Sequence, residues 1–254
     1  MHKVISLIIL LLISNMFYSQ GIINSLHNHD IADVRDSVFV EEIESEEVFY
    51  GKFEQTYFKK ISVYNKENRL VSEIGYDKNG KIQNRYFIEY DSTNTKKTSI
   101  KIQRKNSTYY KKYEYDNNGF LIKISEMNAN KDVIVSTEFK NNNQGYPLES
   151  LTTNFSSNSI YKETAEYSID ENLVIISKVN DEGRVRKYAN SINNLIKYSE
   201  DVTNNQGDII KIENTEYEYK YDKLNNWIEK IEYRIINGSR QKYSSIKRKI
   251  KYRK

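Results

Sequence analysis

The sequence predicts an all-β fold, in which repeated antiparallel β-hairpins follow one another as a meander and form an extended, twisted or partly wrapped sheet. Three observations predict this fold. A short turn phrase recurs along the chain, breaks rich in Asn and Gly come roughly every 12 residues, and the runs between the breaks alternate with the period of two that is typical of strands. No long stretch shows a clear helical period.

The turn phrase begins with Tyr, continues with Asp or Asn, and has Gly or Asn in its fifth place. It occurs at residues 64–68, 76–80, 90–94, 115–119 and 221–225. The side chain in the second place can accept hydrogen bonds from the backbone amides just ahead of it. Gly or Asn in the fifth place tolerates the positive φ that a tight reversal needs. The Tyr and the seventh residue, which is usually apolar, then become cross-strand neighbours, so each phrase predicts a hairpin.

The runs that flank the turns place alternate side chains on opposite faces. In residues 217–221, Tyr217, Tyr219 and Tyr221 share one face, and acidic or basic residues occupy the other. Beyond the next turn, the same alternation places Trp227 and Tyr233 on a common face. An outer-membrane barrel is the architectural alternative, but charges occur on both faces of many strands and lipid-facing aliphatic rows are missing.

The composition favours wide, thinly covered sheets over a deep aliphatic core. The chain has 22 tyrosines but only nine glycines and one proline, so Asn takes over many turn positions. Tyrosine suits a half-buried surface, because the ring packs while the hydroxyl stays in water. The absence of cysteine excludes disulfides, thiol catalysis and cysteine-based metal sites.

The first twenty residues are typical of a cleavable secretory signal. Lys3 precedes the apolar run 4–13, which is too short to span a bilayer. Cleavage is expected near Ser19, Gln20 or Gly21; Phe17 or Tyr18 at the upstream site departs from the small-x-small pattern. The sequence therefore predicts a signal peptide at 1–20, an acidic N-terminal lead-in at 21–47 and a hairpin-repeat domain at 48–254. No later segment is apolar enough to cross a membrane as a helix, so we expect an exported protein of the periplasm, the cell surface or the extracellular space.

The two ends of the exported chain carry opposite charge. Residues 30–47 hold eight acids against one base, and residues 238–254 hold eight bases and no acid. A basic end can indicate a polyanion site. Residues 246–252, however, alternate: Ile246, Ile250 and Tyr252 lie on one face, interrupted by Arg248, and lysines lie on the other. We interpret this segment as a lysine-protected edge strand, and no nucleic-acid partner is predicted.

The repeated phrase resembles the YD repeat of the RHS family, most closely in short secreted proteins of Bacteroidetes type. The stretches "YDKLNNWIEKIEY" and "YEYDNNGFLIKI" carry the resemblance, which covers residues 50–236. It implies stacked hairpins in a curved or spiralling sheet at the cell surface or beyond it. Large members enclose a toxin or form adhesive stalks, and carbohydrate binding has been attributed to the repeat. The chain is too short to enclose a cargo, and the repeat offers no catalytic residue to carry over.

Residues suited to catalysis are few. His27 and His29 could share a metal ion on an extended segment, but no third ligand follows at a suitable spacing, so no metal site and no cofactor are predicted. Phosphate loops, nucleophile elbows and zinc-protease motifs are absent. The aspartates of the turns are explained by turn formation. We therefore predict a non-enzymatic protein, with a small hydrolase as a minor alternative.

The function predicted is that of a structural or interaction module of the cell envelope or surface. The main alternative is a carbohydrate-binding module, because exposed aromatic rows can stack on sugar rings. A partner protein for a secreted toxin is a further alternative. The expected partner is a surface polysaccharide or another envelope protein. The candidate ligand-binding residues are Tyr217, Tyr219, Tyr221, Trp227 and Tyr233.

Overall fold

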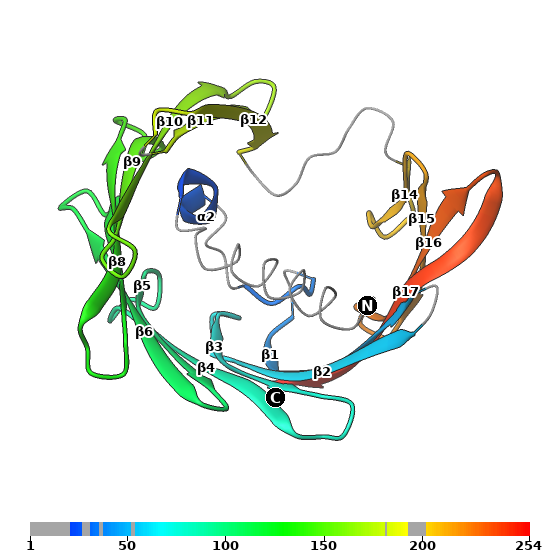
Figure 1. Cartoon of the computed structure of the whole chain (residues 1–254). Helices are drawn as coiled ribbons and strands as arrows, with labels where there is room; N and C mark the ends of the chain where they lie inside the picture. Colours follow the sequence, from blue (N-terminus) through cyan, green and yellow to red (C-terminus); the bar gives the residue numbers. More distant parts are fainter. Residues whose placement is uncertain (1–20, 27–30, 36–37, 52–53, 181, 193–201) are drawn as a thin grey trace. The chain divides into compact units, whose positions relative to one another are not determined.

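The computed structural model describes residues 21–26, 31–35, 38–51, 54–180, 182–192 and 202–254. The signal peptide predicted for residues 1–20, and the histidines His27 and His29, lie outside these ranges. The chain divides into two compact units: unit 1 comprises Met1–His29 and Tyr109–Ile196, and unit 2 comprises Asp30–Thr108 and Lys197–Lys254. Antiparallel strands dominate both units (Figure 1), and the prediction of an all-β protein made of repeated hairpins is confirmed.

Unit 1 is a meander in which each strand pairs antiparallel with the next from β6 to β12. The short helix α2 (Ile22–Leu26) packs against β9 and β10, and its Ile22 joins a core with Val174 and Ile176. Among the residues described, no helix is long and apolar enough to cross a membrane. The strands are β6 (Ser107–Tyr115), β7 (Leu121–Met127), β8 (Val133–Asn141), β9 (Pro147–Asn154), β10 (Ser159–Ser168), β11 (Leu173–Val179) and β12 (Val185–Ser191).

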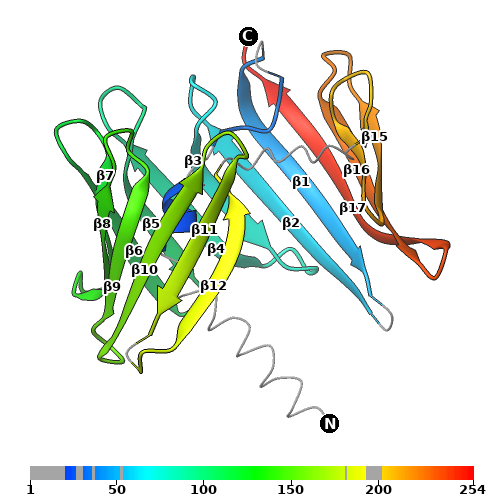
Figure 2. The same cartoon turned by 90° about the horizontal axis from the view of Figure 1, so that it is seen from above.

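Unit 2 joins strands from both ends of the chain. The C-terminal strand β17 pairs with β16 on one side and with the first strand, β1, on the other, and β1 also pairs with β2 (Figure 2). The remaining strands continue as hairpins in both directions. The strands are β1 (Val40–Tyr50), β2 (Gln55–Tyr64), β3 (Leu70–Tyr76), β4 (Ile82–Tyr90), β5 (Lys97–Arg104), β13 (Val202–Thr203), β14 (Ile209–Ile212), β15 (Thr215–Tyr221), β16 (Trp227–Ile236) and β17 (Ser239–Tyr252).

The edge-strand prediction for residues 246–252 is wrong, because β17 has a hydrogen-bonded partner on each side. The acidic run 41–47, which the sequence assigned to a lead-in, lies in β1 and meets the lysines of β17. Lys251 Nζ lies 2.6 Å from Glu41 Oε1, and Lys249 Nζ lies 3.5 Å from Glu44 Oε1. The repeat sheet therefore begins at Val40 rather than at residue 48. The opposite charges of the two chain ends serve their pairing with each other.

The strands around β1 have two chemically different faces. We call one the ion-pair face: it carries cross-strand pairs such as Lys59–Glu44 at 2.7 Å and Lys220–Glu229 at 2.6 Å. Such partly exposed pairs contribute little each, but together they keep this face hydrated. We call the other the pocket face. The strand registers place on it Ile43, Ser45 and Glu47 of β1, Phe58, Lys60 and Ser62 of β2, Glu73 and Gly75 of β3, and Ile246 and Arg248 of β17.

The predicted turn chemistry is confirmed at every copy of the phrase. The fifth residue has positive φ in each: Asn68 (58°), Gly80 (74°), Asn94 (56°), Gly119 (83°) and Asn225 (59°). In the second place, Asp222 Oδ1 accepts the amides of Leu224 at 2.8 Å and Asn226 at 3.0 Å, and Asp77 does the same for Asn79 and Lys81. In four copies the first and seventh residues pair across the strands, as in Tyr76 with Ile82 and Tyr221 with Trp227, and in the copy at 90–94 Tyr90 pairs with the eighth residue, Lys97. The register shifts at that pair in each copy.

Several residues at or next to the end of a strand bond back to the first residue of the preceding strand. Tyr90 Oη donates to the Leu70 carbonyl at 2.9 Å, and Tyr167 Oη donates to the Pro147 carbonyl at 2.7 Å. The Asn141 side-chain amide makes the same bond to the Leu121 carbonyl at 2.9 Å. Each acceptor lies 20 residues upstream. These bonds give the hydroxyls an architectural role, since they lock each hairpin to its neighbour.

The turn carboxylates predict a specific pH dependence of stability. The amides of Lys81 and Asn79 lower the pKa of Asp77, so its contribution is present above the ordinary Asp pKa of about 4 and is lost as pH falls through the lower folded-state pKa. We expect Asp77→Asn to fold, because Asn occupies the same place at Asn65. The difference in thermal midpoint between wild type and D77N should shrink as pH falls from about 6 to about 2. A difference that stays constant over this range, measured by circular dichroism, would contradict the assignment.

Candidate functional site

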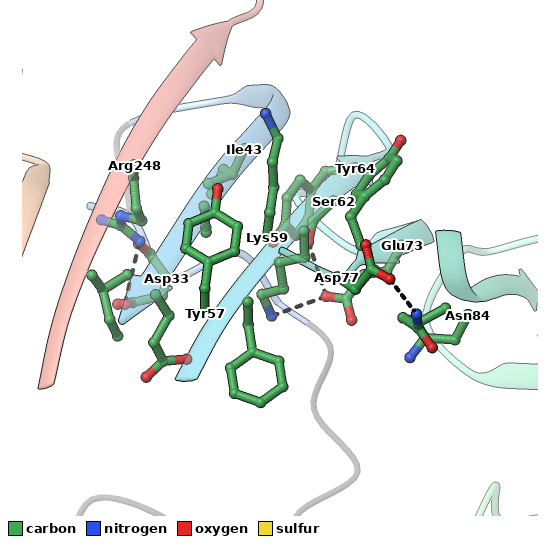
Figure 3. Close-up of a pocket in the computed structure, with 18 of the residues that line it drawn as sticks. Asp33, Ile43, Tyr57, Lys59, Ser62, Tyr64, Glu73, Asp77, Asn84 and Arg248 are labelled. Carbon is green, nitrogen blue, oxygen red and sulfur yellow. Dashed lines mark hydrogen bonds and ion pairs between the residues drawn. The ribbon is translucent and has the colours of Figure 1, made fainter. Parts of the chain in front are cut away.

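A cavity of about 680 Å³ lies on the pocket face of unit 2. It collects side chains from β1, β2, β3, β4, β16 and β17, and Figure 3 shows how several of them lie around β2. A volume of this size fits a ligand of a few sugar or amino-acid residues. The polar lining residues include Asp33, Glu47, Lys60, Ser62, Glu73, Asp77, Asn84 and Arg248, and the aromatic ones include Phe58, Tyr64 and Trp227.

Glu73 of β3 is the centre of one polar cluster in the cavity. Lys60 Nζ lies 2.9 Å from Glu73 Oε2, and the Ser62 hydroxyl donates to the same oxygen at 3.0 Å (Figure 3). Across the ladder, Gly75 faces Asn84, and a Cβ atom on Gly75 would lie only 2.4 Å from Asn84 Oδ1. The glycine therefore leaves the room that the Asn84 amide occupies in the cavity.

Glu47 of β1 is a second acid of the cavity. Burial raises its pKa, and Lys60 acts in the opposite direction. No hydrogen bond or ion pair joins its carboxylate to another of the described residues. Phe58 lies directly opposite it on β2. Glu47 therefore offers acceptor oxygens to a molecule in the cavity, beside an aromatic ring.

Arg248 and Trp227 close one side of the cavity. The Arg248 guanidinium carbon lies 3.2 Å from the centre of the Trp227 ring, and two of its nitrogens donate to the Trp227 carbonyl at 2.9 Å and 2.6 Å. A third bond runs from Arg248 Nη1 to the Asp33 carbonyl at 2.8 Å. The Trp227 indole N–H donates to Asp33 Oδ2 at 3.0 Å. Backbone carbonyls and the indole ring thus hold this buried cation in place.

Asp33 belongs to a short segment, residues 31–35, that we call the strap. Its first residue, Ile31, bridges Arg69 next to the turn between β2 and β3. Its last residue, Arg35, donates its amide to Asn226 Oδ1 at 2.8 Å and forms an ion pair with Asp208 at 2.5 Å. The strap therefore ties turns at both sides of β1 and β17 and positions Asp33 at the cavity.

The predicted tyrosine row forms as a packed row. The ring centres of Tyr217 and Tyr219 are 6.5 Å apart, and those of Tyr219 and Tyr221 are 6.0 Å apart and stacked. The Tyr219 hydroxyl donates to the Ile209 carbonyl at 3.1 Å, and the Tyr221 hydroxyl donates to Asp208 at 2.7 Å. Burial raises the pKa of Tyr219, and it raises that of Tyr221 to about 12. These two hydroxyls are therefore committed to internal bonds.

Trp227 and Tyr233 do not share a face, contrary to the prediction from simple alternation. Trp227 pairs with Tyr221 and contacts Tyr219 edge-on, with ring centres 6.4 Å apart. The register shift next to the turn puts it on the side of the tyrosine row. Tyr233 lies on the opposite side, where its hydroxyl donates to Glu218 at 3.1 Å and Arg240 covers its ring. The structure brings four of the five predicted residues together and separates the fifth.

Most of the cavity residues escaped prediction from the sequence. Two local signals pointed to them. Arg248 interrupts the otherwise apolar row of Ile246, Ile250 and Tyr252, which indicates a buried charge with partners. Gly75 interrupts a strand, which indicates a close approach of another group. Lys60, Glu73 and Glu47 look like ordinary alternating surface charges, and only the strand register brings them together.

The comparisons with known proteins leave the chain without a family. No protein-family model matches it, and no curated protein matches it in sequence. A crystal structure of a porin-like protein from Bacteroides uniformis is similar over 84% of this chain and 96% of its own, at 14% identity and a TM-score of 0.47. The structure of TcdB2-TccC3-Cdc42 is similar over 75% of this chain, at 13% identity and a TM-score of 0.39, and the match spans 13% of that chain. Scores this low do not establish a common fold.

Proposed function

We propose that the protein is an exported, non-enzymatic interaction module that binds a hydroxyl-rich ligand, a saccharide of the cell surface, in the cavity on its pocket face. One observation carries the proposal: the 680 Å³ cavity combines aromatic rings with carboxylate, ammonium and amide groups on adjacent strands. Rigid neighbouring strands suit a binding site, because they hold each group in a fixed position.

The chemistry of the cavity matches that of a sugar. The apolar face of a pyranose packs on an aromatic ring, and Phe58 and Trp227 supply such rings. Sugar hydroxyls both donate and accept hydrogen bonds, so they need acceptors such as Glu47 beside donors such as Lys60. The Asn84 amide offers one of each. Hydrogen bonds to charged groups contribute more than neutral ones, which favours a site of this composition.

The proposed location rests on the predicted signal peptide and on the resemblance of the turn phrase to the YD repeat. Both support a role at the envelope or beyond it. The turns are regular, and strand-end side chains bond to the first residue of the preceding strand. Both features support a scaffold whose function is to present a surface.

A polysaccharide array followed by calorimetry on the best hit tests the proposal. Lys60→Gln and Glu73→Gln each remove the charge of one partner of the 2.9 Å pair while keeping its size, and we expect affinity to fall about 10- to 100-fold. Lys220→Gln is the matched control: it breaks the 2.6 Å pair with Glu229 on the ion-pair face and should leave affinity unchanged. Equal losses in all three variants would contradict a site on the pocket face.

Three further variants sharpen the assignment. Gly75→Ala places a methyl group against the flexible end of Asn84, so we expect a protein that still folds but has weaker binding. Tyr233→Ala removes an aromatic residue from the ion-pair face and should change nothing, whereas Trp227→Ala should reduce binding. If no polysaccharide is retained by the wild type, the cavity is not a glycan site and the structural role of the module stands alone.

A further inference from the structure

Glu163 of β10 is a buried carboxylate that lies against the first described residues of the chain, Gly21 and Ile22. The residue is 6% exposed, and its Oε2 accepts the backbone amide of Ile22 at 2.9 Å. Its Oε1 accepts the Tyr188 hydroxyl at 3.3 Å, and Lys178 Nζ lies 3.6 Å away. Burial, with Glu163 next to it, raises the pKa of Tyr188 to about 12. Lys178 forms a long ion pair with Oε1 from a partly exposed position, so the buried carboxylate can accept a second, closer positive charge at Oε2.

The backbone of residues 21 and 22 is pressed against this carboxylate. A Cβ atom on Gly21 would lie 2.1 Å from Glu163 Oε2, so the carboxylate sits directly beside the Gly21 backbone, in the space that a larger residue would make it leave. The next residue, Ile22, is fully buried and is part of the core with Ala165, Val174 and Ile176. The Ile22 side chain in the core thus fixes the position of the Ile22 amide beside the Glu163 carboxylate.

We propose that the signal peptide is removed at the Gly21–Ile22 bond and that the freed α-ammonium of Ile22 forms a buried ion pair with Glu163. The backbone nitrogen that becomes the amine already lies 2.9 Å from the carboxylate oxygen. Cleavage adds a positive charge at this atom, opposite the carboxylate. This inference does not depend on the ligand of the pocket face.

The sequence before this bond agrees with the assignment. A signal peptidase recognises small residues directly before the cleaved bond and two positions further upstream. Gly21 occupies the first of these positions and Ser19 the second. In the reaction, water adds across the amide: the Gly21 carbonyl carbon gains the hydroxyl, the C–N bond breaks, and the Ile22 nitrogen takes the remaining proton of the water. The new Gly21 carboxyl group then ionises, and its proton converts the amine into the ammonium. The Ser25 amide loses its 3.3 Å bond to the Gly21 carbonyl, but the Ser25 hydroxyl still donates to the Ile22 carbonyl at 2.7 Å.

The first test is the N-terminus of the exported protein. The whole chain, with its own signal, is produced in a Gram-negative host and recovered from the exported fraction. Sequencing and intact mass are expected to give Ile22 as the first residue. Any other first residue in the exported protein overturns the proposal.

The second test measures the ion pair by a double-mutant cycle. The exported protein is compared with a cytoplasmic form that carries residues 19–254 behind an initiator Met, each with and without Glu163→Gln. In the exported form we expect E163Q to lower the melting temperature by about 5–10 °C, and in the extended form by less than half of that. Glu166→Gln, at an exposed position of the same strand, should have no effect in either form.

Equal losses from E163Q in the two forms would show that the amine makes no contribution, and the proposal would fall. If E163Q does not accumulate, the comparison uses the exported and the extended forms that keep Glu163. We then expect the exported form to have the higher melting temperature. Equal melting temperatures would again overturn the ion pair.

Discussion

Replacing Arg248 by methionine is expected to destabilise the protein by roughly 3–5 kcal/mol. The side chain is 4% exposed, and its guanidinium satisfies the Trp227 and Asp33 carbonyls while it stacks on the indole ring. Methionine keeps the length of the side chain but donates no hydrogen bond, so the Trp227 and Asp33 carbonyls lose their partner. Burial lowers the pKa of Arg248 to about 10, which still leaves it charged at neutral pH.

The matched control is Lys249→Met, one residue further along β17. Its side chain is 82% exposed on the ion-pair face and lies 3.5 Å from Glu44, so we expect a change below about 0.5 kcal/mol. Urea unfolding followed by tryptophan fluorescence measures both, because Trp227 is the only tryptophan of the chain and stacks on Arg248. Similar losses in the two variants would show that the guanidinium network contributes nothing of its own.

The second large effect is expected at Asn68. Asn68→Gly keeps the positive φ of the turn but removes both hydrogen bonds of the side chain. The Asn68 amide oxygen accepts from the Val40 backbone amide at 2.8 Å, and its amide nitrogen donates to the Val38 carbonyl at 2.6 Å. Both bonds fix the entry into β1, and Asn68 is 9% exposed. Since the Val40 amide is left without its acceptor, we expect a loss of about 2–3 kcal/mol in the free energy of unfolding.

Asn225 provides the comparison, because it occupies the same place of the same turn phrase with φ 59°. Asn225→Gly removes no comparable bond to β1, and glycine accepts this φ without strain, so the free energy of unfolding should change by less than about 0.5 kcal/mol. Equal effects of N68G and N225G would mean that the turn conformation, and not the contact with β1, decides the stability. Chemical denaturation of the two variants distinguishes these outcomes.

The hairpins could be predicted from the sequence because their chemistry is local. Asp77 and Gly80 lie three residues apart, and each acts on amides or dihedral angles within the same turn. The same reasoning failed for Tyr233, because a register shift beside the turn changes the side on which Trp227 lies. Alternation counts residues, and it has no means of detecting a bulge.

The cavity required information that local reasoning does not contain. Of the five residues proposed as a ligand site, only Trp227 lines it. Glu47 and Arg248 meet because β1 pairs with β17, a contact between residues about 200 positions apart. The complementary charge of the two chain ends was visible in the sequence. The alternating lysines of residues 246–252 are equally typical of a lysine-protected edge strand and of a strand that pairs with an acidic partner. The sequence pattern alone does not distinguish these two arrangements.

The pairing of β1 with β17 also sets an order of assembly. The segment from β6 to β12 is continuous in sequence, so its strands can pair as soon as they have been synthesised. Unit 2 instead cannot complete its sheet before the end of the chain is available. Its first strand, β1, gains its second hydrogen-bonded partner only when β17, residues 239–252, pairs with it. Until then one edge of the acidic strand β1 lacks its partner, and the charges of β1 hinder pairing with a wrong strand in that interval. The C-terminal lysines thus determine when folding can be completed as well as how the two ends are held.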